Sequence, residues 1–270
     1  MPELPEVETT KRGIEPYLLK QHIKAVTVFQ WQMRWPIPKK IQRLEGQEIT
    51  AVDRRGKYIL LKTDIGQAIL HLGMSGSLRI CTQSEERRKH DHVEITTVSG
   101  ALLRFHDPRR FGCLLWQSKE DPTHALLARL GPEPLGTDFN DRHLIAATRK
   151  RKSSIKNLIM NSHVVVGVGN IYASEALHMA GIRPTRAAGK LTHAECGKLV
   201  SSIKTVLQKS IDQGGTTLRD FVNTDGEPGY FKQSLFVYGK EGEPCKRCKK
   251  AIKQVVIAQR STFYCPACQK

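Results

Sequence analysis

The sequence predicts an α+β protein with a strand-rich first part, a helical middle part and a short cysteine-containing hairpin at the end. Three observations carry this prediction. Short apolar runs recur in the first half of the chain, apolar residues take helical spacing after residue 136, and two Cys-x-x-Cys pairs lie near the C-terminus. Because segment 131–136 is rich in Pro and Gly, we place a boundary there and expect domains at residues 1–131, 132–228 and 229–270.

The first part opens with a helix predicted from about Glu6 to Lys20. Acidic residues come early in this stretch and basic residues later, which is the order that the helix macrodipole favours. Strands follow, since several runs are short, rich in β-branched residues and bounded by Gly, Asp or charged residues. These runs are residues 49–52, 58–63, 67–72, 92–98 and 101–105.

Two helices are predicted in the middle part. Asn170 is the expected N-cap of a helix over residues 171–180, which Gly181 ends. The segment Thr192–Glu195 has the form of a capping box, and the apolar residues of 195–211 that follow it have helical spacing.

Charge is spread unevenly over the 270 residues, whose formal net charge is +17. Residues 1–141 carry 21 basic and 18 acidic residues, whereas residues 142–270 carry 22 and 8. So basic a half favours nucleic acid as the partner, with an anionic membrane face or a solvated surface as the alternatives. No apolar run approaches the roughly 20 residues needed to cross a bilayer, and the acidic N-terminus is unlike a secretion signal. We therefore expect a soluble, intracellular protein without a membrane partner.

Four of the seven cysteines form two Cys-x-x-Cys pairs separated by sixteen residues. They are Cys245, Cys248, Cys265 and Cys268. Four thiolates at this spacing fit tetrahedral Zn²⁺, and since the protein supplies every ligand, the predicted site is structural. A pair of disulfides is the alternative, but a chain without a secretion signal is expected in a reducing compartment.

The segment that contains these pairs is predicted to contact nucleic acid. Strands over residues 235–245 and 253–265 are expected to join the pairs as a hairpin. Six basic residues and no acidic residue lie in and between the pairs. The other cysteines are scattered singly and are interpreted as small buried hydrophobic residues. They are Cys81, Cys113 and Cys196.

The turn at residues 166–170 contains two glycines and immediately precedes a predicted helix. Such a backbone can approach an anion closely, and the first N–H groups of the helix point at it. Five basic residues stand nearby in the sequence, so a phosphate clamp is favoured over a plain tight turn. They are Arg149, Lys150, Arg151, Lys152 and Lys156.

The N-terminus gains unusual chemistry if Met1 is removed, because Pro2 then carries a secondary amine. A secondary amine that adds to a sugar aldehyde carbon gives an iminium, which is cationic without taking up a proton and withdraws electrons from the adjacent C–H bond. Such a group suits cleavage of a nucleotide sugar, and Glu3, Glu6 and Glu8 lie close by in sequence. An ordinary helix start is the alternative interpretation.

Motifs along the whole chain resemble those of bacterial formamidopyrimidine-DNA glycosylases, in order and with similar spacing. They are 1-MPELPEVETTKRGIEP-16, 71-HLGMSGSLRI-80, 89-KHDHVEI-95, 107-DPRRFG-112, 165-VVGVGNIYASEAL-177, 213-QGGTTLRDF-221, 228-PGYF-231 and 259-QRSTFYCPACQK-270. The resemblance implies a β-sandwich-like N-terminal domain with flanking helices, a helical helix-two-turn-helix domain and a C-terminal zinc-finger β-hairpin. One departure is Asn161-Ser162, where the family commonly has Asp followed by Gln or Asn.

The resemblance implies a bifunctional DNA glycosylase and AP lyase. Such an enzyme excises 8-oxoguanine and formamidopyrimidines and then cuts the strand by β,δ-elimination. The implied partner is double-stranded DNA containing oxidised purines, the implied cofactor is one structural Zn²⁺, and the protein is expected to be a monomer in the bacterial cytoplasm. Two alternatives stay open. An endonuclease VIII-type glycosylase for oxidised pyrimidines tends to have Gly where this chain has Leu4, and a non-catalytic DNA-binding zinc protein would keep the scaffold alone.

The resemblance also implies the catalytic residues, which are Pro2, Glu3, Glu6, Lys57 and Arg260. Pro2 matches the nucleophile that attacks C1′ of the damaged nucleotide, Glu3 the acid that protonates the opening sugar, and Glu6 a carboxylate that supports the site. Lys57, in the predicted turn between two strands, matches a lysine that contacts phosphate and assists β-elimination. Arg260 matches an arginine implicated in δ-elimination. A guanidinium is a poor general acid, so we expect it to stabilise the leaving phosphate electrostatically.

The implied DNA-binding residues are Met74, His90, Arg109, Phe111, Arg151, Lys156 and Asn170. Met74, Arg109 and Phe111 match the residues that fill the space left when the base leaves the stack. Arg109 would face the orphaned cytosine, whose edge offers two acceptors to a guanidinium fork, whereas adenine offers a worse edge. His90 and Arg151 match DNA-contacting positions, and Lys156 and Asn170 match phosphate binders. Residues 217–231 correspond to the loop that covers the flipped base.

Overall fold

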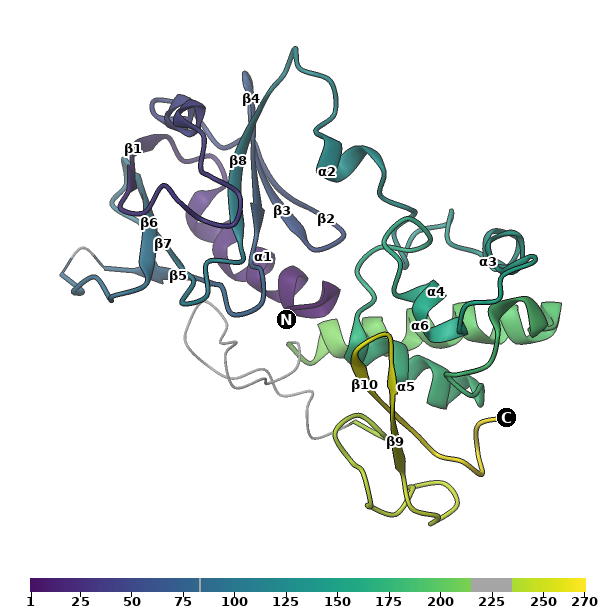
Figure 1. Ribbon diagram of the computed structural model, residues 1–270. Coiled ribbons are helices and arrows are strands. Elements are labelled where there is room, and N and C mark those ends of the chain that lie inside the picture. Colours follow the sequence, from purple (N-terminus) through teal and green to yellow (C-terminus); the bar gives the residue numbers. More distant parts are fainter. Residues whose placement is uncertain (83, 215–234) are drawn as a thin grey trace. The chain divides into compact units, whose positions relative to one another are not determined.

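The computed structural model describes residues 1–82, 84–214 and 235–270 of the chain. Most of these residues form two compact units (Figure 1), one of residues 1–128 and one of residues 129–212 together with 235–270. The first unit is rich in strands and the second is largely helical, which confirms the predicted α+β class. The division into three domains remains a prediction, and its boundary at residues 228 and 229 lies outside the described residues.

No helix in the described part of the chain combines the length and the apolar character that crossing a membrane requires.

The first unit packs two four-stranded antiparallel sheets around one apolar core. The strand orders are β1-β6-β7-β5 and β2-β3-β4-β8. Buried side chains of both sheets and of α1 form one continuous cluster, so the unit is sandwich-like with α1 packed against it. The elements are α1 (Leu4–Leu18), β1 (Ile23–Val28), η1 (Lys39–Leu44), β2 (Ala51–Arg55), β3 (Tyr58–Thr63), β4 (Gly66–His71), β5 (Ser77–Cys81), β6 (Asp91–Thr97), β7 (Leu102–His106), β8 (Cys113–Ser118) and α2 (Ala125–Ala128).

The five predicted strands are present as β2, β3, β4, β6 and β7, whereas β1, β5 and β8 go beyond the prediction. β5 contains Arg79, a residue that argues against a buried strand. One NH2 group of its guanidinium forms an ion pair with the buried carboxylate of Asp91 at 3.2 Å, a partner that sequence reasoning did not supply. β1 has an irregular register between Ile23 and Ala25, which disturbs the alternation on which a strand prediction depends.

α1 begins and ends two residues earlier than the predicted range from Glu6 to Lys20. Glu3 is its N-cap, and the backbone N–H of Glu3 donates to Glu6 Oε2 at 2.8 Å while the Glu3 side chain accepts the backbone N–H of Glu6. This capping box begins with an acid where the usual motif has Ser or Thr, which explains the early start. At the other end, Lys20 has a left-handed φ of 61° and cannot continue the helix.

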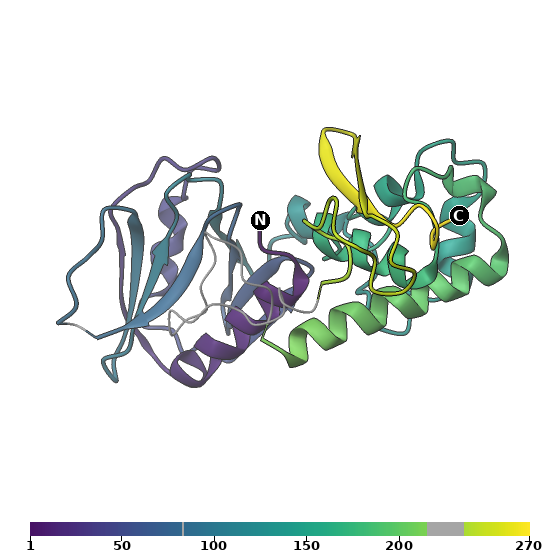
Figure 2. The same cartoon turned by 90° about the horizontal axis from the view of Figure 1, so that it is seen from below.

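The second unit centres on α5 and α6, which pack against each other, with α3 packed on α6. Its elements are α3 (Asp141–Thr148), α4 (Ile155–Ile159), α5 (Asn170–Ala180), η2 (Ala188–Lys190), α6 (His193–Asp212), β9 (Lys253–Ile257) and β10 (Arg260–Tyr264). In Figure 2 the yellow β9–β10 hairpin projects away from the light-green α6. The hairpin packs on α5 through β10.

The capping box at the start of α6 is confirmed. Glu195 N–H donates to Thr192 Oγ1 at 3.2 Å, and Thr192 N–H donates to Glu195 Oε2 at 2.8 Å. The N-cap prediction for Asn170 is wrong, because Gly169 is the N-cap and Asn170 is the first residue of α5. The Asn170 side chain is engaged elsewhere, as described below, and is not available for capping.

The prediction of a strand over residues 235–245 is also wrong, because the structure has no strand in this range. This segment makes turns, and its pairing is limited to an isolated bridge between Pro244 and Ala251. The hairpin is instead β9 paired with β10, so both of its strands lie between the two cysteine pairs.

Candidate functional site

The start of α1 holds Pro2, Glu3 and Glu6 in a buried setting. Glu3 is 2% exposed and Glu6 is 0% exposed, and the capping box joins them. Glu6 therefore fixes the backbone that immediately follows Pro2. While Met1 is attached, the nitrogen of Pro2 belongs to an amide whose lone pair is delocalised into the carbonyl. This nitrogen becomes a nucleophile only after Met1 is removed.

Lys57 lies in the turn between β2 and β3, where it was expected from the sequence. Gly56 takes a left-handed φ of 58° in this turn. The Arg54 guanidinium donates to Gly56 O at 2.9 Å and to Glu8 Oε2 at 2.8 Å. Burial raises the pKa of Glu8, but hydrogen bonds from Arg54 and a second arginine outweigh it and lower the pKa below its usual value. Arg54 therefore ties the Lys57 turn to α1 through a stable ion pair.

His71 is a residue of this region that sequence reasoning missed, although it opens the motif that contains Met74. Its ring lies 4.9 Å from that of Tyr58, its partner across β3 and β4. Burial, and secondarily the charge of Lys57, lowers the pKa of His71 to about 4. The imidazole is therefore neutral at physiological pH, and its Nδ1 accepts the backbone N–H of Gly73 at 2.9 Å.

The three predicted space-filling residues lie on two loops of the first unit. Met74 and Phe111 are each 38% exposed, so both present apolar side chains to solvent. The Arg109 guanidinium lies 4.8 Å from the centre of the Phe111 ring, and that of Arg34 lies 5.7 Å from it. A pocket of 510 Å³ is lined by residues of the Arg34 and Phe111 segments. Arg34 was not predicted from the sequence, because no motif contains it.

The two other predicted DNA-contacting residues lie in different units. His90 is half-buried, with its ring 6.2 Å from that of His92 and 5.9 Å from that of His106. Arg151 is exposed in the second unit, and its backbone carbonyl accepts the N–H of Gly189 at 2.9 Å.

Lys156 is only 1% exposed, whereas the sequence suggested a surface cation beside Arg149–Lys152. Its Nζ donates to Asn170 Oδ1 at 2.6 Å and to Thr262 Oγ1 at 2.7 Å, and Asn170 Nδ2 donates to Ser261 O at 2.9 Å. The structure thus brings together Lys156 and Asn170, the two predicted phosphate binders, at the strand that begins with Arg260. Arg260 itself is exposed.

Asn161-Ser162, where the chain departs from the family's usual residues, lies in a turn that is held by hydrogen bonds to these two residues. Asn161 Oδ1 accepts the N–H of His163 at 3.0 Å, and Asn161 O accepts the N–H of Val164 at 2.9 Å. Ser162 O accepts the N–H of Gly131 at 2.8 Å. The backbone before the turn at 166–170 is therefore braced by these contacts.

The four paired cysteines converge, with all four Sγ atoms within 4.8 Å of one another. Individual separations are 3.4 Å between Cys248 and Cys265 and 3.9 Å between Cys245 and Cys268. Burial and the neighbouring thiols raise the pKa of Cys268 to about 12, which disfavours its thiolate unless a cation is bound. The donor set and its convergence fit one structural Zn²⁺, which confirms the prediction.

Glu175 joins this cysteine region to α5 and was also missed by sequence reasoning. Its buried carboxylate accepts three successive backbone N–H groups at 2.8, 2.9 and 2.9 Å, from Phe236, Val237 and Tyr238. Burial raises the pKa of Glu175 despite these hydrogen bonds. A single charged residue among the apolar and small residues of 165-VVGVGNIYASEAL-177 is the signal that could have identified it.

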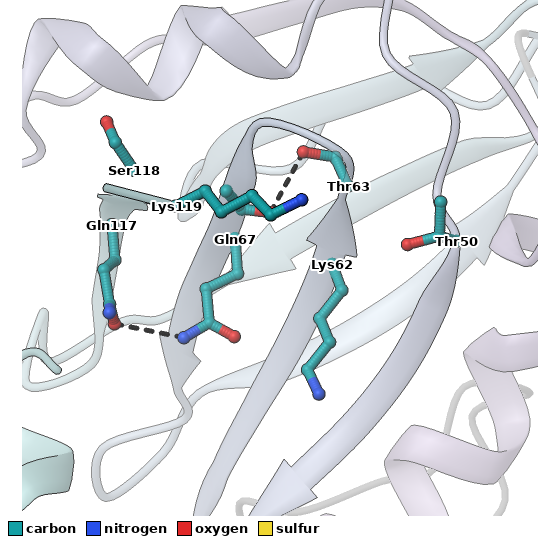
Figure 3. A pocket seen from close by; sticks show the side chains of 8 residues that line it. Thr50, Lys62, Thr63, Gln67, Gln117, Ser118 and Lys119 are labelled. Carbon is teal, nitrogen blue, oxygen red and sulfur yellow. Dashed lines mark hydrogen bonds between the residues drawn. The ribbon is translucent and has the colours of Figure 1, made fainter. Parts of the chain in front are cut away.

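A second pocket of the first unit lies apart from these residues (Figure 3). It has a volume of 220 Å³ and is lined at its polar rim by Lys62, Gln67, Gln117 and Lys119. The Gln67 and Gln117 amides bond at 3.1 Å. It lies at the end of β3 opposite the Lys57 turn and contains none of the predicted site residues. The predicted lesion-covering loop at 217–231 lies outside the described residues.

Comparison with known families accounts for most of the chain. Three family models match it: Formamidopyrimidine-DNA glycosylase N-terminal domain over residues 1–114, Formamidopyrimidine-DNA glycosylase H2TH domain over residues 130–222, and Zinc finger found in FPG and IleRS over residues 242–270. Similar relatives include the formamidopyrimidine-DNA glycosylases of Thioalkalivibrio sulfidiphilus, 57% identical, and Alteromonas mediterranea, 54% identical, each aligned over 271 residues with 100% of both chains covered.

Solved structures agree with these matches. The MutM (FPG) protein from Thermus thermophilus superposes with a TM-score of 0.90 at 37% identity, covering 99% of this chain and 98% of that one. A Lactococcus lactis FPG mutant in complex with Fapy-dG containing DNA superposes with a TM-score of 0.92 at 34% identity, covering 100% of both chains.

Proposed function

The chain belongs to the formamidopyrimidine-DNA glycosylase family, and from this premise we propose that it is a bifunctional DNA glycosylase and AP lyase of base excision repair. Its substrate is duplex DNA that carries 8-oxoguanine or a formamidopyrimidine. The observation that supports the proposal is the buried Glu3–Glu6 capping box, because it holds two carboxylates at the start of the helix that directly follows Pro2 in the sequence.

Base excision begins once Met1 is gone and Pro2 bears a secondary amine. The Pro2 nitrogen attacks C1′, the bond from C1′ to the base breaks, and the amine proton leaves with the base. Glu3 protonates O4′ as the C1′–O4′ bond opens, which leaves an iminium between Pro2 and C1′. Glu6 holds the backbone N–H of Glu3 and so keeps the acid beside the reacting carbon.

Strand cleavage follows from the electron demand of the iminium. Loss of a C2′ proton expels the 3′ phosphate by β-elimination, and loss of a second proton expels the 5′ phosphate by δ-elimination. Lys57 and Arg260 stabilise the negative charge that develops on these leaving groups. A guanidinium keeps its proton at physiological pH, so Arg260 acts through its charge.

Duplex recognition uses the remaining residues. Met74, Arg109 and Phe111 fill the space that the flipped nucleotide leaves, and Arg109 reads the orphaned cytosine. The DNA backbone is contacted by His90, by Arg151 and by the pair of Lys156 and Asn170. The zinc-bearing hairpin positions Arg260. The enzyme acts as a monomer, in the cytoplasm and on the nucleoid where its substrate lies.

An end-labelled duplex with 8-oxoguanine opposite cytosine tests this function. We expect one-nucleotide gaps with phosphates at both ends, because β,δ-elimination removes the whole sugar. Release of the base with an intact strand would show that the protein is a glycosylase without AP lyase activity. Cleavage of oxidised pyrimidines in preference to 8-oxoguanine would replace the substrate by that of the endonuclease VIII type, and binding without cleavage would leave a DNA-binding zinc protein.

A further inference from the structure

Asp107 is a buried carboxylate that accepts hydrogen bonds from two different loops. It is 0% exposed. Its Oδ1 accepts the hydroxyl of Ser75 at 3.1 Å and the backbone N–H of Arg109 at 3.3 Å, and its Oδ2 accepts the backbone N–H of Gly112 at 2.7 Å. One side chain therefore bridges the loop before β5 and the loop before β8.

Each of these contacts lies at or beside a space-filling residue. Ser75 follows Met74, Gly112 follows Phe111, and Arg109 is itself the residue that faces the orphaned base. A carboxylate that accepts two backbone N–H groups and a hydroxyl fixes three points of the backbone at once. The buried Asp107 carboxylate consequently positions the backbone that carries the side chains that enter the duplex.

The turn that carries Arg109 is under conformational strain that such a support would maintain. Arg110 N–H donates to Asp107 O at 3.1 Å, and Pro108 occupies the position that favours this turn. Arg110 then takes a left-handed φ of 56°, which is uncommon for a residue with a side chain. Arg110 stands directly between Arg109 and Phe111, so this strained residue sets the relative direction of their side chains.

The two loops also touch through their backbones. A Cβ placed on Gly73 would lie 2.4 Å from the nitrogen of Gly112, so the two backbones approach too closely there for a side chain to fit between them. The main chain of Asp107 extends the same framework, since His92 Nε2 bonds to Asp107 O at 2.8 Å and Asp107 N–H donates to His90 O at 3.0 Å.

We propose that Asp107 is the positioning residue that holds both the Met74 loop and the Arg109–Phe111 loop, and that its bonds to the second of these loops set the preference for cytosine opposite the lesion. This inference rests on the proposed function. A guanidinium fork discriminates between base edges only when its direction is fixed, and a misplacement of about 1 Å is enough to lose about 100-fold in rate. Asp107 touches neither the sugar nor Pro2, so it acts on opposite-base discrimination through Arg109.

The test is the Asp107→Asn variant, measured in single turnover on 8-oxoguanine opposite cytosine and opposite adenine. Asn keeps the size of the side chain but replaces one acceptor oxygen by an NH2 donor. The two backbone N–H groups, which bond to different oxygens of Asp107, then no longer both find an acceptor. We expect the cytosine-to-adenine rate ratio to fall by about tenfold, in line with the loss of a charge-assisted hydrogen bond. Asp121→Asn is the matched control, because Asp121 Oδ2 also accepts a backbone N–H, from Ser118 at 3.1 Å, in the same unit.

Ser75→Ala separates the two loops and serves if Asp107→Asn does not fold. It removes the contact to the Met74 loop and leaves the two bonds from Asp107 to the other loop, so we expect slower excision with the cytosine-to-adenine ratio preserved. The proposal is overturned if Asp107→Asn loses excision opposite both bases and borohydride trapping on a preformed abasic site to the same extent, or if it keeps the wild-type ratio. It is also overturned if Ser75→Ala excises at the wild-type rate. Failure of the proposed function is distinguishable, because the wild-type protein itself would then show neither excision nor trapping.

Discussion

The two units hold their predicted functional residues in different ways. In the first unit these residues stand on a helix start and on turns, and buried carboxylates hold the backbone of those elements, as Glu6 does for Glu3. In the second unit the central group is a buried cation, Lys156, which bonds to the side chains of Asn170 and Thr262 and to the carbonyl of Ser261. The four clustered thiols of this unit form the zinc site. Backbone anchoring suits a reaction that needs fixed geometry, whereas a concentration of positive charge suits binding to phosphates.

The charge counts follow the same division. Residues 1–128 carry 20 basic and 15 acidic residues, whereas residues 129–212 together with 235–270 carry 21 basic and only 8 acidic residues. We therefore assign chemistry and base reading to the first unit and most of the salt-dependent affinity to the second. Variants of the catalytic residues of the first unit should change rates at nearly constant affinity, and variants of the second unit, apart from those of Arg260, should do the reverse.

The largest expected effect is that of Glu3→Gln. The amide keeps an acceptor for the capping box but cannot donate a proton to O4′, so excision of 8-oxoguanine should slow by about 10²–10⁴-fold while DNA affinity changes little. Single-turnover excision and a binding titration measure the two quantities. Glu15→Gln, on the same helix, is the control, because Glu15 is partly exposed and bonds locally, to Lys11 at 2.7 Å in the same helix. A comparable loss of affinity in Glu3→Gln would break the division between the units.

Loss of the metal should have the next largest effect. Cys245→Ser removes one of four ligands, so metal analysis should find no Zn²⁺, and DNA affinity should fall by at least about tenfold because the hairpin no longer orders its basic residues. Cys81→Ser alters a buried cysteine outside the cluster and should keep the metal. Unchanged affinity in the metal-free protein would show that the hairpin is dispensable for binding.

Lys156→Met should weaken binding more modestly. It removes a cation and leaves the acceptor groups of Asn170 and Thr262 without their donor, so the slope of log affinity against log salt should fall by about one. Lys24→Met changes an exposed lysine of β1 and is the control. An unchanged salt slope together with a lower unfolding temperature would mean that Lys156 serves the fold alone.

The smallest effect at neutral pH concerns His71. Its pKa in the folded chain is lowered to about 4, so between pH 6.5 and 4 the unfolded chain binds a proton that the folded chain does not. The free energy of unfolding should therefore decrease as pH falls through this window, by about 1.4 kcal/mol per pH unit for each such group. In His71→Asn the dependence of the free energy of unfolding on pH, measured by denaturant titration, should be weaker by up to about 1.4 kcal/mol per pH unit, which corresponds to one proton. An equal dependence in the variant would contradict the assigned protonation state.

Sequence reasoning recovered the features that depend on local pattern. The Lys57 turn, the capping box of α6 and the convergence of the four cysteines follow from spacing alone. It did not recover features that depend on a distant partner. Arg79 looks unsuited to a strand until Asp91 is placed beside it. Lys156 looks like a surface lysine until Thr262, more than one hundred residues away, is seen to accept a hydrogen bond from it.

Glu175 and Asp107 illustrate the same limit at the candidate sites. Both lie inside recognisable motifs, yet the backbone groups that they hold belong to other segments, namely residues 236–238 for Glu175 and Gly112 and the Ser75 loop for Asp107. No local rule predicts which N–H groups a buried acid will meet. These positions are where the structure adds most to the interpretation.

The central claim is that the amine of Pro2, freed by removal of Met1, forms the covalent link to the sugar. Borohydride reduction during the reaction with 8-oxoguanine opposite cytosine, followed by peptide mapping by mass spectrometry, tests it directly. The account predicts that protein lacking Met1 is captured and that the DNA adduct lies on the N-terminal peptide at Pro2. Capture at Lys57 or another lysine, or no capture from zinc-loaded protein that lacks Met1, would contradict it.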